Sequence, residues 1–182
     1  LGLRLSNALD GHPGEVDLKV SYRWSDQGGL LIEHMVTWVS GPASPISCTP
    51  HLFFKLNDDP TIDDHTLWVD GAALLVLDGQ GVATGERQPL DAVPWGLQSA
   101  SRLGSCPPLD HAFELKPSAA GDDLRCVARL SATSSGLCMS VWTTEPVMQV
   151  YTAGALGTGA TQDIGKDGIL RSLVRPDVHL GL

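Results

Sequence analysis

Alternating apolar and polar residues predict β-strands in the first part of the chain. In residues 16–23, apolar side chains occupy every second position and polar side chains stand between them, as in a strand with one buried face. Residues 30–39 form a second apolar run. The glycine-containing turn of residues 25–29 connects the two runs, so the pattern predicts a β-hairpin.

The rest of the chain shows further strand patterns and no helical one. No window of eleven or more residues repeats apolar positions at i, i+3, i+4 and i+7, the spacing of an amphipathic helix. Many short strands separated by turns predict an all-β fold, an antiparallel β-sandwich. Residues 85–108 are irregular, and we expect a long connection there that shapes a site or wraps an edge. Further strands are expected at residues 47–57, 65–77, 111–115, 124–130, 137–143 and 148–152.

The charge of the chain argues against two classes of partner. Its formal net charge is −9 over 182 residues, without a basic run. Phosphate backbones and anionic lipids repel such a chain, so we expect no nucleic-acid partner and no membrane partner. No apolar run approaches the roughly 20 residues that cross a bilayer. The length suits a single domain over residues 1–182, and we expect it in the cytoplasm.

The motifs of metal, phosphate and serine chemistry do not occur in the sequence. The four cysteines form no C-x-x-C pair and the six histidines stand far apart, so we expect reduced thiols and no metal site. Residues 154–159 are rich in glycine but lack the lysine of a phosphate-binding loop. No serine stands in a G-x-S-x-G frame.

His51 is the first candidate for chemistry. It is the only histidine in the apolar run of residues 47–57. A histidine can donate or accept a proton near neutral pH, because its unperturbed pKa is about 6.5. His51 is therefore either a general acid or a strand histidine whose ring nitrogen is satisfied by a neighbour.

Two polar side chains on later strands suit a sugar site. Asp110 stands with His111 at the start of a strand, where an Asp-His pair is also typical of a turn cap. Gln149 and Tyr151 share one face of another strand. Each sugar hydroxyl is both a donor and an acceptor, so carboxylates and amides that converge from separate strands can fix its orientation.

Seven segments between Gly11 and Ala153 match, in order, the landmarks of one enzyme family. TPHLFFKL resembles its Thr-Asn-His-x-Tyr-Phe-Asn-Leu segment, LDHAFEL its Tyr-Asp-His-Asn-Phe segment, and EPVMQVYTA its Pro-Gly-x-Gln-x-Tyr-Thr segment. GHPGEVDLKVSY, HTLWVDG, GVATGE and QPLD resemble four further landmarks. The family that these segments resemble is that of the aldose 1-epimerases, or galactose mutarotases.

The resemblance implies a fold, a ligand and three site residues. It implies a galactose mutarotase-like supersandwich that binds a hexose of the galactose or glucose type without a cofactor. It matches His51 to the catalytic acid, Asp110 to a sugar-binding carboxylate and Gln149 to a sugar-contacting amide.

The sequence also departs from the family's pattern. Pro50 replaces the asparagine before His51. Counting back from the Pro176-Asp177 pair, Arg171 stands where the family has its catalytic glutamate, although Asp167 could substitute in a shifted register. The family's N-terminal portion, with an arginine and a histidine of the site, has no counterpart, and neither do its closing strands. We therefore expect a partial chain whose exposed edges are covered by a partner protein or by a missing remainder.

Two functions follow from this comparison with the family. The first is an aldose 1-epimerase that interconverts the α and β anomers of a hexose, impaired because a guanidinium at Arg171 cannot accept a proton. The second is a catalytically inactive carbohydrate-binding or assembly module on the same fold.

Overall fold

The fold is almost entirely β-structure, as the sequence predicts. The structure, a computed structural model, describes residues 1–6, 11, 13–26, 28–118, 124–153 and 180–181. It divides into two compact units, Leu1–Pro50 and His51–Leu182, and each is described by itself. All strand pairs are antiparallel in the described residues, so the prediction of an all-β antiparallel fold is confirmed. The expectation of one domain over residues 1–182 stays a prediction.

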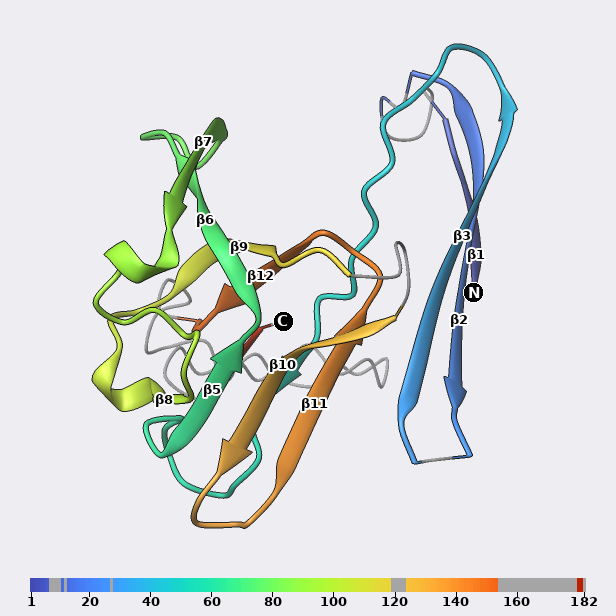
Figure 1. The fold of residues 1–182 in the computed structure, drawn as a ribbon. Helices are drawn as coiled ribbons and strands as arrows, with labels where there is room; N and C mark the ends of the chain where they lie inside the picture. Colours follow the sequence, from blue (N-terminus) through green and yellow to red (C-terminus); the bar gives the residue numbers. More distant parts are fainter. Residues whose placement is uncertain (7–10, 12, 27, 119–123, 154–179, 182) are drawn as a thin grey trace. The chain divides into compact units, whose positions relative to one another are not determined.

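The first unit, Leu1–Pro50, is a three-stranded sheet in the order β1-β2-β3 (Figure 1). The hairpin that the sequence predicts is formed by β2 and β3, whose register runs from Glu15 opposite Ser40 to Trp24 opposite Leu30. The bounds are β1 (Gly2–Leu5), β2 (Glu15–Trp24) and β3 (Leu30–Ser40).

One face of this hairpin is almost wholly apolar, and we call it the apolar face of unit 1. Alternate residues of a strand share a face, so the register places the apolar residues of β2 opposite those of β3. The opposite face carries polar partners such as Asp17 opposite Thr37 and Ser21 opposite Glu33. The apolar face consists of the pairs Val16–Trp38, Leu18–Val36, Tyr22–Ile32 and Trp24–Leu30, together with Val20 opposite His34.

The second unit, His51–Leu182, contains two sheets. The four-stranded sheet has the order β11-β10-β5-β8, and the six-stranded sheet has the order β4-β13-β12-β9-β6-β7 (Figure 1). The first consists of β5 (His65–Val69), β8 (Ser101–Arg102), β10 (Arg125–Ala132) and β11 (Cys138–Thr143). The second consists of β4 (Phe53–Phe54), β6 (Gly71–Leu77), β7 (Ala83–Pro89), β9 (Asp110–Leu115), β12 (Val147–Tyr151) and β13 (Leu180–Gly181).

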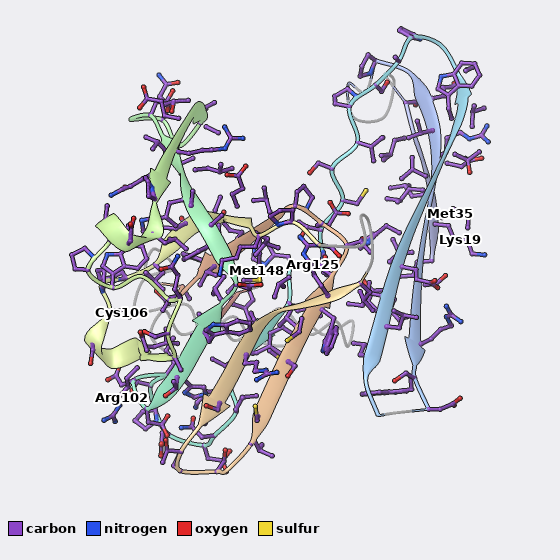
Figure 2. All side chains as sticks on the ribbon, viewed as in Figure 1. Lys19, Met35, Arg102, Cys106, Arg125 and Met148 are labelled. Atoms are coloured by element: carbon purple, nitrogen blue, oxygen red, sulfur yellow. The ribbon has the colours of Figure 1, made fainter. Side chains whose placement is uncertain are left out.

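The core of this unit packs side chains of the two sheets against each other. Leu67 and Leu130 from the four-stranded sheet share one apolar cluster with Phe113 and Val150 from the six-stranded sheet. These four side chains are fully buried, and Met148 of β12 also points into the cluster (Figure 2). Burial of these apolar side chains is the main stabilising contribution to such a sandwich.

The long connection predicted for residues 85–108 covers one end of this core. It holds the end of β7 and two single-turn 3₁₀ helices, η1 (Leu90–Ala92) and η2 (Leu103–Ser105). Leu90, Leu97 and Leu103 are buried in the same cluster. The connection is therefore part of the packed unit, and β7 extends into a stretch whose sequence shows no strand pattern.

The apolar run of residues 65–77 is two strands rather than one. β5 ends at Val69 and β6 begins at Gly71, and the two strands belong to different sheets. A Cβ atom at Gly71 would lie 2.7 Å from Leu90 Cδ1 and 3.3 Å from Phe113 Cδ1. The chain thus changes sheet where the absence of a side chain lets the backbone approach the core.

Candidate functional site

The candidate site lies on the face of the six-stranded sheet that points away from the core. In the register of β9 and β12, Asp110 pairs with Tyr151 and Ala112 with Gln149. Asp110 and Gln149 are therefore diagonal neighbours on one face, while the alternate residues Met148 and Val150 are buried.

Two of the three predicted site residues are in direct contact. The Gln149 side chain donates a hydrogen bond from Nε2 to Asp110 Oδ1 at 2.7 Å, and both residues are exposed. The acceptor is a carboxylate, and hydrogen bonds to an ionised carboxylate are stronger than those between neutral groups. This hydrogen bond uses neither the amide oxygen of Gln149 nor the second carboxylate oxygen of Asp110, so these two atoms can bind hydroxyl groups.

His51 is connected to this pair through two aromatic rings. It is exposed and lies just before β4, with its ring centroid 5.0 Å from that of Phe53. Phe53 and Tyr151 are both register partners of Gly181, on its two sides. Their rings meet edge to face at 6.3 Å, an arrangement that aromatic pairs favour. The rings thus lead from His51 along the sheet face to Asp110.

A cavity adjoins Asp110 on the side of β6. It has a volume of about 380 Å³, and its lining includes Trp95 and His111. The two rings lie 4.8 Å apart, and the Asp110 backbone N–H donates to His111 Nδ1 at 3.1 Å. Burial lowers the pKa of His111, against the opposing effect of the Asp110 charge. The ring is therefore neutral at pH 7, with its proton on Nε2.

Sequence reasoning singled out neither Trp95 nor His111 as part of the lining of this cavity. Trp95 comes from the long connection, whose path across the sheet has no signal in the sequence. His111 stood beside Asp110 in the motif but was considered there as part of a turn cap. Its position follows from strand alternation, because His111 must point to the opposite side of β9 from Asp110.

A second carboxylate on the same face, that of Glu114, is paired with the guanidinium of Arg87. Glu114 follows Asp110 on β9, and both of its carboxylate oxygens accept from Arg87 Nε at 2.8 Å. Alternation places Glu114 on the face of Asp110 and Gln149. Both oxygens of Glu114 are therefore already engaged by Arg87.

Arg171 and Asp167 lie outside the described residues. Among the residues that are described, no group of three or more His, Cys, Asp or Glu side chains could hold a metal ion. The thiols of all four cysteines are free. No helix in the described part of the chain is long and apolar enough to cross a membrane.

The sequence model of the aldose 1-epimerase family matches residues 1–175 of the chain. The chain belongs to the aldose 1-epimerase family. The resemblance seen in the sequence segments is thereby confirmed. Human galactose mutarotase is 30% identical over 155 residues, and the Escherichia coli K12 aldose 1-epimerase is 27% identical over 158 residues.

This member of the aldose 1-epimerase family corresponds to only part of the length of these relatives. Each of the two alignments covers 81% of this chain and 44% of the relative, so the chain spans less than half the length of these proteins. A solved GalM/aldose epimerase homologue from C. elegans matches with a TM-score of 0.80 and 20% sequence identity. That match covers 99% of this chain and 54% of the other, and it supports the galactose mutarotase-like fold.

Proposed function

We propose that this chain binds a hexose on the outer face of the six-stranded sheet, as part of an isomerase that interconverts its α and β anomers. The observation that carries the proposal is the Gln149–Asp110 hydrogen bond. The Phe53 and Tyr151 rings link His51 to the same face of the sheet. A converging amide and carboxylate next to aromatic rings are suited to a sugar, which has hydroxyls on its rim and apolar C–H groups on its faces.

The chemistry assigns different roles to the three residues. A base removes the proton of the anomeric hydroxyl and an acid protonates the ring oxygen, so that the ring opens and can close on either face of the carbonyl. We assign the acid to His51 and the hydroxyl contacts to Asp110 and Gln149. This reaction needs a matched acid and base and no cofactor.

The base is the missing part of this assignment. The position that the family resemblance assigns to a glutamate holds Arg171, and a guanidinium stays protonated at physiological pH. Glu114 on the same face is neutralised by Arg87. We therefore propose that the 182-residue chain binds a hexose weakly and epimerises it poorly or not at all. Arg171 is also what favours the alternative, a catalytically inactive carbohydrate-binding or assembly module.

Replacing Gln149 by Ala should weaken hexose binding by about 5- to 150-fold, because a sugar hydroxyl would lose its partner, a loss of about 1–3 kcal/mol. Calorimetric titration with galactose and with glucose measures the dissociation constant. Gln80→Ala is the matched control, since Gln80 lies in the turn between β6 and β7 and its substitution should leave the constant unchanged. Equal affinities of the Gln149→Ala variant and the unmodified chain would place the sugar elsewhere.

We also propose that another chain, or a further part of the same protein, covers the apolar face of unit 1. A contiguous apolar surface on a sheet is typical of an interaction site, and here it runs the length of the β2–β3 hairpin. With a net charge of −9, this partner is expected to be neither nucleic acid nor membrane. The cytoplasmic location also stays a prediction.

The 182-residue chain should therefore self-associate or bind an apolar dye such as ANS. Light scattering measures self-association, and dye fluorescence measures dye binding. Tyr22→Lys places a charge on the apolar face and should reduce both signals, whereas Ser21→Lys places the same charge on the opposite face and should not. A monomer with low dye binding and cooperative melting would contradict the proposal.

A further inference from the structure

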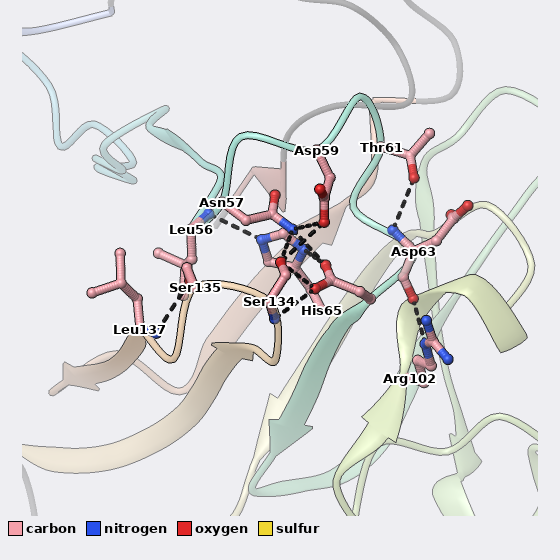
Figure 3. A network of polar contacts seen from close by, with 11 residues as sticks. Leu56, Asn57, Asp59, Thr61, Asp63, His65, Arg102, Ser134, Ser135 and Leu137 are labelled. Atoms are coloured by element: carbon pink, nitrogen blue, oxygen red, sulfur yellow. Dashed lines mark hydrogen bonds and ion pairs between the residues drawn. The ribbon is translucent and has the colours of Figure 1, made fainter.

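A buried histidine, His65, is bonded to the segment that carries His51 (Figure 3). Its side chain is 0% exposed at the first position of β5. Its Nε2 atom accepts a hydrogen bond from the backbone N–H of Leu56 at 2.9 Å. Leu56 lies on the same short stretch as His51, beyond β4. The ring of one histidine therefore fixes the backbone that leads to the other.

The hydrogen bond from Leu56 sets the proton position on this ring. Because Nε2 of His65 acts as an acceptor, the neutral ring carries its proton on Nδ1. Nδ1 lies 3.0 Å from Asp64 Oδ1 but makes no hydrogen bond to it. We regard the contact as an attraction between the N–H dipole and the carboxylate. The Ser134 hydroxyl is the main cause of a lowered pKa of Asp64, so this carboxyl is ionised at neutral pH.

The next residue of the segment, Asn57, is held by the same group of side chains. Its Nδ2 atom donates to Asp64 Oδ1 at 2.7 Å and to Asp59 Oδ2 at 2.8 Å. Ser134, in the turn between β10 and β11, donates from Oγ to Asp64 Oδ2 at 2.8 Å. The backbone of Leu56 and the side chain of Asn57 are thus both tied to the four-stranded sheet.

The other end of the segment is held at the sugar-binding face. There the Phe53 ring packs against Tyr151, and the backbone of β4 pairs with β13. The stretch between His51 and Asn57 is therefore held by aromatic packing and strand pairing near His51 and by the polar network at its other end. The side chains of Phe54 and Leu56 also pack against the core. Loss of the His65 acceptor would leave the part-buried Leu56 N–H unsatisfied and would loosen the backbone at this end of the stretch.

We propose that His65 is a positioning residue for His51: it holds the His51 segment in place by accepting the Leu56 N–H, and takes no part in the proton transfer. This inference rests on the proposed function, because His51 needs a fixed position only if it acts on a bound sugar. Small displacements of a proton donor reduce turnover strongly and sugar affinity little, since the hydroxyl contacts are assigned to Asp110 and Gln149.

The test compares His65→Leu with His65→Gln. Leucine fills the buried space without an acceptor, whereas the side-chain oxygen of glutamine can accept the Leu56 N–H. In His65→Leu we expect hydrogen exchange of the Leu56 amide to rise at least about tenfold, and hexose affinity to change less than about twofold. With Arg171→Glu as background, kcat should fall about 10- to 100-fold at unchanged KM. His65→Gln should restore both the exchange rate and kcat.

Other outcomes decide against the inference. Unchanged Leu56 exchange in His65→Leu would overturn it, and so would equal effects of the leucine and glutamine variants on kcat. If His65→Leu does not fold, His65→Met, which also lacks a strong acceptor, takes its place, and unaltered exchange at Leu56 in that variant would likewise overturn the inference. Hexose binding by the unmodified chain tests the proposed function separately. If the chain binds no sugar, the proposed function fails, while Leu56 exchange still decides whether His65 holds the segment.

Discussion

Replacing Arg171 by Glu should raise the rate at which the chain epimerises a hexose by about 10²- to 10⁴-fold, the usual contribution of one proton-transfer group. The substitution restores a proton acceptor at the position where the family pattern has its catalytic glutamate. The change in optical rotation of freshly dissolved α-glucose or α-galactose measures the rate.

Two further variants serve as controls for this gain. Arg171→Lys keeps the charge and supplies no acceptor at neutral pH, so it should gain nothing. Adding His51→Ala to Arg171→Glu should remove the gain, because the acid is lost. A rate enhancement by the unmodified chain that disappears in His51→Ala would contradict the assignment and indicate a complete epimerase. If no variant binds or converts a sugar, the module without catalytic activity is the correct alternative.

Replacing Leu130 by Ala should lower the free energy of unfolding by about 2–5 kcal/mol, which is large for a single domain. Leu130 is 0% exposed in the cluster between the two sheets of the second unit. Truncation removes buried apolar area and leaves a cavity that the neighbouring strands cannot close. Urea unfolding followed by tryptophan fluorescence measures the change.

The same substitution at an exposed leucine is the control. Leu137, the residue before β11, is 57% exposed, so Leu137→Ala should change the free energy of unfolding by less than about 0.5 kcal/mol. Equal effects of the two substitutions would mean that the core does not lie between these sheets.

The strands were predictable where apolar residues alternate with polar ones or form a short run between turns. Alternation identifies β2, and the apolar runs of β10, β11 and β12 stand between clear turns. The change of sheet at Gly71 was not predictable, because the apolar run continues through it and the reason is the approach of Leu90 in space. β7 was missed because Ala83–Pro89 has no buried face, and pairing with β6 is what makes it a strand.

The sequence predicts which residues form the candidate site, but it does not predict how they are arranged in space. The direct contact of Asp110 and Gln149 depends on the register of β9 and β12, which the sequence does not specify. His65 carried a usable signal, since it alternates with Leu67 and Val69 on a buried face. A histidine at such a position needs a partner for each ring nitrogen. Its partner Leu56 belongs to a segment whose path the sequence cannot show.

The central claim is that a hexose binds at Asp110 and Gln149, next to His51. The most direct measurement is a titration of the ¹⁵N-labelled chain with galactose and with glucose, followed by NMR through the backbone amides and the Gln149 side-chain amide. We predict saturable shifts that are largest at Asp110, Gln149 and Tyr151, with smaller shifts at His51 and Phe53. Saturable shifts centred on the first unit, Leu1–Pro50, or no saturable shifts with either sugar, would contradict the claim.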